Sequence, residues 1–73
     1  MLTASTVRIV RAFLAIGQTE LTKRMNVSSS LVAAVETGAK RITPEFTKRF
    51  KRATGITDGL LIDIEYLRGK LAE

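Results

Sequence analysis

The chain has 73 residues, enough for one domain, and it contains no cysteine and no histidine. This composition excludes disulfide bridges and the commonest zinc ligands, so a small core must rely on tight packing or self-association. The net charge is +5, with +7 on residues 1–54 and −2 on residues 55–73. Such an uneven basic charge indicates a polyanionic partner, above all nucleic acid, although a basic surface that serves only solubility is the alternative.

Turn-forming residues divide the chain into five predicted helices, and period-two alternation of the kind found in strands is weak. The first helix is predicted at about residues 5–15, with a cap at Thr3, Ser5 or Thr6. Two apolar stripes run along it, one expected to face the core (Val7, Val10 and Leu14) and a second one (Ile9, Phe13 and Ile16).

The second helix is predicted at residues 18–25, with Leu21 and Met25 facing inward. Asn26 follows where the chain must turn sharply, and asparagine tolerates the left-handed conformation better than most residues. These features predict a helix that ends in a tight turn.

The third helix is predicted at residues 28–37. Ser28 is a suitable N-cap, Val32 and Val35 point inward, and Gly38 can end the helix with a positive φ. The segment from Val27 to Val35 carries no charge, which is unusual in so basic a chain.

The fourth helix is expected to begin at Thr43-Pro44, a cap followed by proline at the first helical position, and to stop at Gly55. Its predicted apolar face consists of Phe46, Phe50 and Ala53. Four basic residues cover much of the remainder and are interpreted as a solvated face, with phosphate binding as the alternative: Lys48, Arg49, Lys51 and Arg52.

The fifth helix is predicted at residues 58–71, with Asp58 as its cap and Leu61 pointing into the core. Four apolar residues recur at the spacing of a helix–helix seam, Leu60, Ile64, Leu67 and Leu71. That seam packs either within the monomer or between two copies.

The order helix, turn at Asn26, helix is that of a helix-turn-helix, here at about residues 18–37. The segment QTELTKRMNVSSSLVAAVETGAKR resembles the core of the lambda-repressor/Cro-type (XRE-like) DNA-binding domains, and the resemblance covers about residues 7–61. Asn26 replaces the usual turn glycine, Thr22 the usual small alanine, and Thr37 a common asparagine. The resemblance implies an all-α, five-helix lambda-repressor-like domain, here with an extended C-terminal helix.

The resemblance also implies which residues would contact DNA. Base contacts are expected from the start of the third helix and from one turn later, at Ser29, Ser30, Leu31, Ala33 and Ala34. Leu31 could instead be merely exposed. Phosphate contacts are expected from the segments that flank this helix, at Gln18, Thr19, Ser28, Thr37, Gly38, Lys40 and Arg41.

In the same family, positions that match Arg11 and Glu36 often form an ion pair, and we expect a structural pair here. Dimerisation on DNA is expected because two half-sites need a symmetric protein, and the long fifth helix is the first candidate for the interface. Phe13 and Ile9 are expected to be covered by that helix, either from the same chain or from a partner, although ligand binding is an alternative.

Catalysis finds no support, because the chain lacks His and Cys, its acids are scattered, and it has no Gly-rich phosphate loop. We expect no enzyme activity, no cofactor and no metal. The longest unbroken apolar run, residues 12–16, is too short to span a membrane, and the N-terminus lacks the order of a signal peptide. The predicted location is the cytoplasm, without a membrane partner.

The sequence therefore predicts a small transcriptional regulator, similar to phage or mobile-element Cro-like repressors, that binds operator DNA as a homodimer. The alternative is a protein-interaction module on the same fold, such as an antirepressor or a recombination accessory, with weak or no sequence-specific DNA binding. That alternative arises because the reading residues include no Arg, Gln or Asn, the side chains that form bidentate contacts with bases.

Overall fold

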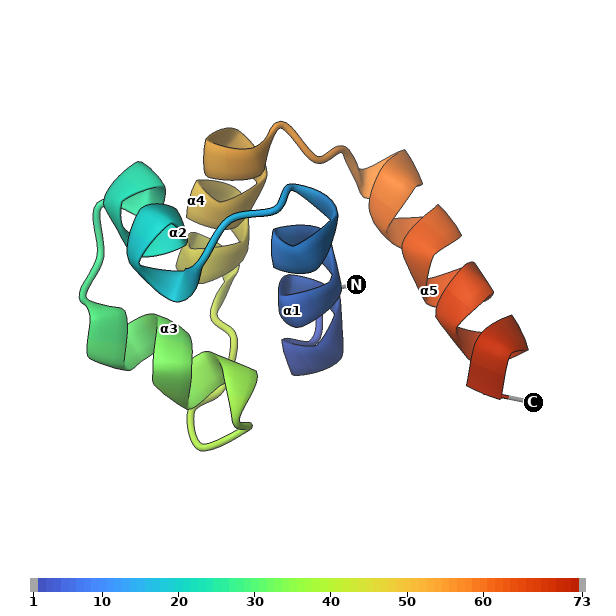
Figure 1. Cartoon of the computed structure of the whole chain (residues 1–73), viewed down its shortest axis with the longest axis horizontal. Coiled ribbons are helices and arrows are strands. Elements are labelled where there is room, and N and C mark those ends of the chain that lie inside the picture. Colours follow the sequence, from blue (N-terminus) through green and yellow to red (C-terminus); the bar gives the residue numbers. More distant parts are fainter. Residues whose placement is uncertain (1, 73) are drawn as a thin grey trace.

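Five helices follow one another with short connections in the computed structural model, which describes residues 2–72, with side chains from residue 2 to residue 70 (Figure 1). The prediction of an all-α domain with five helices is confirmed, and residues 2–72 contain no strand. The helices are α1 (Ala4–Phe13), α2 (Gln18–Met25), α3 (Ser29–Glu36), α4 (Pro44–Thr54) and α5 (Asp58–Ala72).

Hydroxyl side chains cap the start of four helices, α1, α3, α4 and α5. The Oγ atom of Ser28 accepts the backbone N–H of Leu31 at 3.2 Å, and Oγ1 of Thr43 accepts that of Phe46 at 3.1 Å. Thr3 caps α1 in the same way. Each contact satisfies a backbone donor that has no acceptor within its helix, which fixes where the helix begins.

Residues with positive φ end the helices at the places where the sequence predicts turns. Asn26 has φ 57° and ψ 49°, the left-handed conformation, and it closes α2. Gly38 has φ 82° just after α3, and Gly55 has φ 74° at the end of α4. Both glycines adopt a conformation that side chains with a Cβ atom disfavour, so they define the chain reversals that follow α3 and α4.

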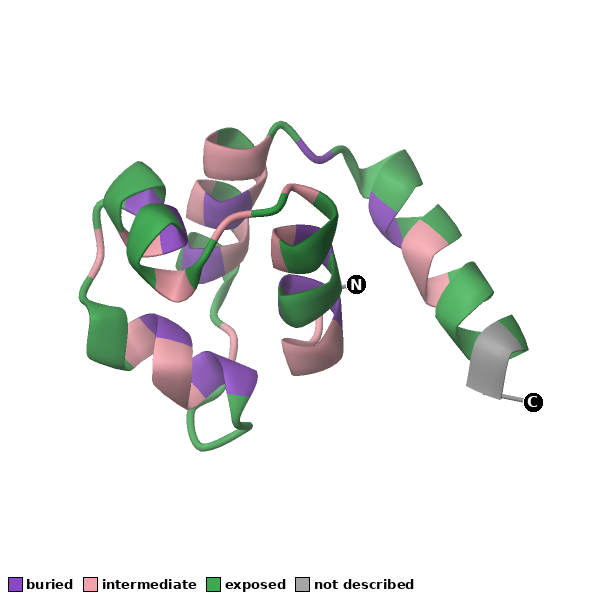
Figure 2. Ribbon diagram, viewed as in Figure 1, coloured by how far each residue is buried: buried purple, intermediate pink, exposed green. Residues whose placement is uncertain are grey.

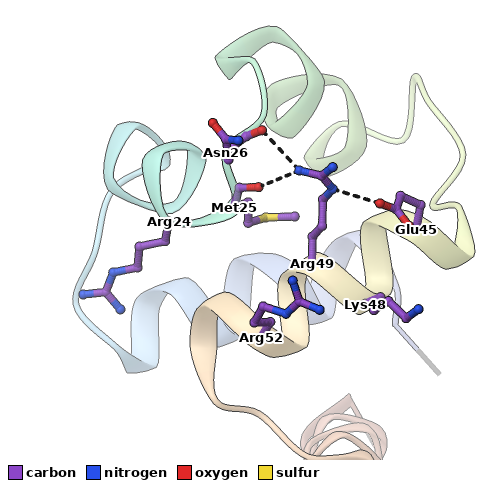
Figure 3. Close-up of a pocket in the computed structure, with 7 residues that line it drawn as sticks. All are labelled: Arg24, Met25, Asn26, Glu45, Lys48, Arg49 and Arg52. Carbon is purple, nitrogen blue, oxygen red and sulfur yellow. Dashed lines mark hydrogen bonds and ion pairs between the residues drawn. The ribbon is translucent and has the colours of Figure 1, made fainter.

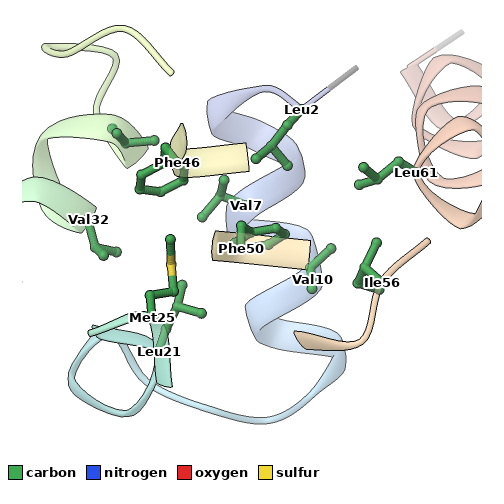
Figure 4. Packing of buried hydrophobic residues seen from close by; sticks show 11 residues of the cluster. Leu2, Val7, Val10, Leu21, Met25, Val32, Phe46, Phe50, Ile56 and Leu61 are labelled. Carbon is green, nitrogen blue, oxygen red and sulfur yellow. The ribbon is translucent and has the colours of Figure 1, made fainter. Parts of the chain in front are cut away.

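The core lies among α1, α2, α3 and α4, where the buried faces of the helices meet (Figures 2 and 4). Each helix contributes residues at helix spacing, and the fully buried members are Val7, Val10, Leu21, Met25, Val32, Val35 and Phe50. Phe46 stacks on Phe50 with ring centroids 6.4 Å apart. The inward-facing positions predicted for α1 to α4 are confirmed for all of these residues.

Two predicted helix boundaries are wrong, the end of the first helix and the cap of the fifth. The first helix stops at Phe13 and not near Ala15, because Ala15 has φ 57° and leaves the right-handed conformation. The fifth helix is capped by Thr57, whose Oγ1 accepts the N–H of Leu60 at 3.1 Å, so Asp58 is its first residue and not its cap. Asp58 instead accepts a hydrogen bond from Nζ of Lys51 at 2.9 Å, and this partner lowers the pKa of Asp58.

The conformation of Ala15 leads to a stability prediction. An L-residue other than glycine pays about 1–2 kcal/mol for the left-handed conformation, whereas glycine pays about 0.5–1 kcal/mol in chain entropy. We therefore expect Ala15→Gly to stabilise the domain by roughly 0.5 kcal/mol in urea denaturation. The matched control is Ala12→Gly, inside α1 and exposed, which should destabilise by about 1 kcal/mol. A loss of stability in both variants would contradict this account.

Helix α5 lies at one end of the molecule and contacts α1 (Figure 1). Leu61 is buried against the core, as predicted, whereas most of the helix is exposed (Figure 2). Glu65 fastens the helix by accepting hydrogen bonds from the hydroxyls of Thr3 and Thr6 at the start of α1. In residues 2–72, none of the helices combines the length and the apolar character needed to cross a bilayer.

Candidate nucleic-acid interface

The outer surface of α3 consists of small side chains without charge. Ser29 and Ser30 are exposed in the first turn, and Ala33 and Ala34 are half-buried one turn later. We call these four residues the reading face. Val32 and Val35 anchor the opposite side of the helix in the core. Because the side chains of the reading face are short, the backbone of α3 can come close to a flat or grooved partner.

The residues predicted to contact phosphates gather mostly at the C-terminal end of α3. Thr37 and Gly38 follow that helix directly, and Lys40 and Arg41 are exposed in the next loop, held there by the N–H of Lys40, which donates to the carbonyl of Ala34 at 3.2 Å. The start of α2 lies at the same end, since Nε2 of Gln18 reaches Oε1 of Glu36. Only Ser28 lies at the other end of α3, where its side chain serves as the N-cap.

The side chain of Gln18 is occupied, because its amide donates to Glu36 at 2.9 Å. A phosphate contact by this side chain would have to replace that bond, whereas the first-turn N–H groups of α2 have no side-chain cap. Thr19 is exposed in the same turn. Any anion at this helix terminus is therefore expected to meet backbone N–H groups and the hydroxyl of Thr19.

Arg11 and Glu36 form the ion pair that the resemblance to lambda-repressor/Cro-type domains implies. Nε and Nη2 of Arg11 donate to the two carboxylate oxygens of Glu36 at 2.9 and 3.0 Å, so the contact is bidentate. Glu36 is 3% exposed, and Arg8 donates to its backbone carbonyl. Since Arg8 and Arg11 belong to α1, the pair holds the end of α3 against α1 and α2 and so fixes the direction of the reading face.

The pKa of Glu36 reflects the same contacts. Burial alone would raise it, but the hydrogen bonds from Arg11 and Gln18, together with the charges of Arg11 and Arg8, lower it below its ordinary value. The pKa of Arg11 is raised, chiefly by its hydrogen bond to Glu36. Both directions favour the charged forms, so the pair remains ionised at neutral pH.

Leu31 differs from the other residues predicted to contact bases. It is half-buried, packs against the core, and lines a groove of about 270 Å³ together with Val27, Phe46 and the basic residues Lys40 and Arg41. It therefore lies beside the reading face, toward α4, and is neither simply exposed nor in the middle of that face.

Sequence reasoning missed the role of Arg49. Its Nη1 donates to the carbonyls of Met25 and Asn26 at 3.3 and 3.4 Å, and its Nε pairs with Glu45 at 3.1 Å (Figure 3). Arg49 thus satisfies carbonyl groups at the end of α2 and ties α4 to the turn between α2 and α3. The only signal in the sequence is the spacing Glu45–Arg49, which indicates an ion pair on α4 but not a contact 23 residues away.

The predicted seam on α5 is only partly occupied in the monomer. Ile64 is half-buried, but Leu60 is 41% and Leu67 is 58% exposed, and the side chain of Leu71 lies outside the described residues. Leu60, Ile64 and Leu67 line a groove of about 320 Å³ whose other walls are Ile9 and Phe13 of α1 and Ile56. We call it the apolar groove.

Of the two covers expected for Ile9 and Phe13, α5 of the same chain leaves both side chains accessible, and cover by the helix of a partner stays a prediction. Phe13 is 79% exposed and Ile9 36% exposed, because α5 diverges from α1 and leaves the apolar groove open between them. In the part of the chain whose side chains are described, its lining includes one charged residue, Asp63. An open apolar surface of this kind is typical of an interaction site.

Comparisons of this chain with known protein-family models, with curated proteins and with solved structures give no match.

Proposed function

We propose that this protein binds double-stranded DNA by placing α3 in the major groove. The observation that carries the proposal is the reading face: an uncharged surface of small residues on a capped, exposed helix, with Lys40 and Arg41 following in the next loop. An α-helix fits the major groove only when its side chains permit a close approach. The likeness to lambda-repressor/Cro-type domains, carried by residues 18–41, supports the same assignment.

The reading face and the basic residues that follow α3 would make different kinds of contact with DNA. Hydroxyls of Ser29 and Ser30 can donate to or accept from base edges, and the methyl groups of Ala33 and Ala34 can pack on thymine methyls. Lys40 and Arg41, with the backbone near Gly38, would hold phosphates and set register. Since the reading face has no side chain that makes bidentate base contacts, part of its specificity would come from DNA shape.

An electrophoretic mobility shift with a salt titration tests this function. The DNA is a duplex enriched from a random-sequence pool by the protein itself, and a scrambled duplex of equal length serves as the control. We expect preference for the enriched site and a slope of log K against log[salt] of about −0.9 for each phosphate contacted. Equal affinity for both duplexes, or no binding, would contradict sequence-specific binding.

We further propose that the protein binds DNA as a homodimer through the apolar groove. The groove exposes Phe13, Leu60 and Leu67 to solvent, which a second copy could cover. Among the side chains that the structure describes, Asp63 is the only charged one that lines the groove, so two copies would not meet there through their basic surfaces. A symmetric dimer matches two half-sites that lie about 34–36 Å apart, one turn of the duplex.

The dimer predicts an effect of Leu67→Glu. A carboxylate in the apolar groove would be desolvated without a partner, so we expect the dissociation constant of the dimer to rise by about 100-fold or more in sedimentation equilibrium. The matched control is Ile62→Glu on α5, since Ile62 is 62% exposed and lies outside the groove. Equal association of both variants and the wild type would exclude this interface.

In the cell, such a dimer would act as a small repressor that occupies promoter DNA, as in phage and mobile-element regulators. The competing function is a protein-interaction module, for example an antirepressor or a recombination accessory, and the open apolar groove is the observation that favours it. The mobility shift separates the two, because a module of that kind would show no preference for the enriched duplex.

A further inference from the structure

A third groove, of about 250 Å³, lies between the end of α2 and the outer face of α4 (Figure 3). Met25 and Asn26 of the helix-turn-helix line one side, and Lys48, Arg49 and Arg52 of α4 line the other. Arg24 and Glu45 complete the lining. We call it the cationic groove, since four of its seven lining residues are Lys or Arg and one is acidic.

The cations of this groove differ in how they are used. Arg49 is bound to Glu45 and to the carbonyls at the end of α2, and Arg24 pairs with Glu20 at 3.2 Å on the exposed face of α2. Lys48 and Arg52 are exposed and have no ion-pair partner among the side chains that the structure describes. These two residues are therefore free to bind an anion without breaking an existing contact.

Lys48 and Arg52 are four residues apart on α4, so they stand on one side of the helix about 6 Å apart along its axis. Like charges at this spacing repel each other, and a bound anion would relieve that repulsion. Each strand of a DNA duplex carries one phosphate for about every 3.4 Å of its axis. Two adjacent cations at this spacing can therefore engage separate phosphates of one strand.

The cationic groove adjoins the surface already assigned to DNA. The groove beside Leu31, which contains Lys40 and Arg41, shares two of its lining residues, Glu45 and Arg49, with the cationic groove. A band of positive charge thus extends from the loop after α3, along α4, to the turn that precedes α3.

We propose that Lys48 and Arg52 bind the phosphate backbone of DNA that flanks the site read by α3. The proposal rests on the DNA-binding function argued above. A duplex held on α3 brings phosphates to this band at high local concentration, and two exposed cations make contacts that do not depend on base sequence. An acidic protein segment is the competing occupant, but the continuity of the band with Lys40 and Arg41 favours DNA.

The test uses two duplexes that share the enriched site at their centre. One is about 20 bp long, enough for two half-sites one turn apart, and the other is about 40 bp long. The variant is Lys48→Gln/Arg52→Gln. Its control, Lys23→Gln/Lys70→Gln, removes the same charge from two exposed lysines outside the groove. Circular dichroism melting establishes that both variants remain folded.

On the long duplex, we expect the variant's slope of log K against log[salt] to be shallower than that of the wild type by about 1.8 for each protomer, or 0.9 for each lost contact. On the short duplex, the slope should equal that of the wild type, and the control should match the wild type on both. If the slope changes equally on the two duplexes, or on neither, Lys48 and Arg52 do not contact flanking DNA. This result would leave DNA binding by α3 unaffected.

Failure of the wild type to bind either duplex would instead overturn the DNA-binding function, and the flanking contact with it. The same mixtures are also titrated with a polyglutamate peptide. One outcome would assign the cationic groove to an acidic protein and overturn the proposal. In that outcome the peptide binds to the wild type and not to Lys48→Gln/Arg52→Gln, and the salt slope on the long duplex is the same for both proteins.

Discussion

We expect the Ser30→Glu variant to fold normally and to lose DNA binding, with an affinity about 100-fold or more below that of the wild type. Ser30 is exposed in the first turn of α3. In the proposed complex, a carboxylate at this position would be desolvated in the major groove, close to the negative phosphates of the duplex. The measurement is fluorescence anisotropy with a labelled duplex that carries the enriched site.

The fold should tolerate this change, because α3 has no acidic residue in its first turn and a negative charge near a helix N-terminus is favourable by about 0.3–1 kcal/mol. Ile62→Glu on α5 introduces the same charge away from α3 and should retain the wild-type affinity for DNA. If Ser30→Glu binds as tightly as the wild type, α3 is not the reading helix.

Arg11→Met is the change with the largest expected effect on stability. It leaves the carboxylate of Glu36, which is 3% exposed, without its bidentate partner. Removal of one partner from a buried ion pair typically costs about 3–5 kcal/mol, a large part of the total stability of so small a domain. The measurement is the free energy of unfolding from urea denaturation, and the variant is expected to be largely unfolded at 37 °C.

The matched control is Arg24→Met, which breaks the exposed pair with Glu20. Its side chains are 42% and 51% exposed, so we expect a loss below about 1 kcal/mol. A second variant, Arg11→Met/Glu36→Met, removes both charges and should recover most of the stability lost in the single variant. If Arg11→Met and Arg24→Met lose the same free energy of unfolding, burial of the Arg11–Glu36 pair does not increase its contribution to stability.

The same pair has a consequence for acid stability. The pKa of Glu36 is lower in the folded protein than its ordinary value of 4.5. The folded state therefore favours the ionised form, and this contribution to stability is present above the unfolded-state pKa and is lost as the pH falls through the folded-state pKa. As the pH falls from about 5 through the folded-state pKa of Glu36, the free energy of unfolding should decrease less in Arg11→Met than in the wild type. The reason is that the carboxylate of Glu36 has lost its main stabilising partner in the variant.

Much of the fold could be predicted because local chemistry determines the ends of the helices. Asn26 can adopt the left-handed conformation, Thr43-Pro44 begins a helix, and Gly55 ends one. Each of these signals depends on one or two neighbouring residues, which a sequence displays directly. The cap of α5 was harder to predict, since Thr57 and Asp58 are both good caps and their surroundings decide between them: Asp58 meets Lys51.

The placement of α5 could not be predicted, because it depends on contacts between residues far apart in the sequence. Glu65 is held by Thr3 and Thr6, and the latter contact joins residues 59 positions apart. The hydrogen bond from Thr6, followed by that from Arg68, lowers the pKa of Glu65, and the hydrogen bond from Thr3 adds a smaller effect in the same direction. The sequence shows the seam of α5 but not its direction, so it could not show that Phe13 stays exposed.

The candidate interface also combines features that the sequence displays directly with features that depend on how the helices pack. The small residues of the reading face and the basic loop after it are visible as a pattern, and the resemblance pairs Arg11 with Glu36. The occupation of the Gln18 side chain by Glu36, and the use of Arg49 to close the end of α2, depend on how three helices meet. These contacts decide which polar groups remain free to bind a partner, and they become visible only in three dimensions.

Entry of α3 into the major groove can be tested by the amide chemical shifts of ¹⁵N-labelled protein, measured with and without the enriched duplex. We expect the largest shift changes on residues 28–34 and on residues 37–41 after them, with smaller changes in the first turn of α2. Changes confined to α1 and α5, with residues 28–41 unaffected, would contradict it.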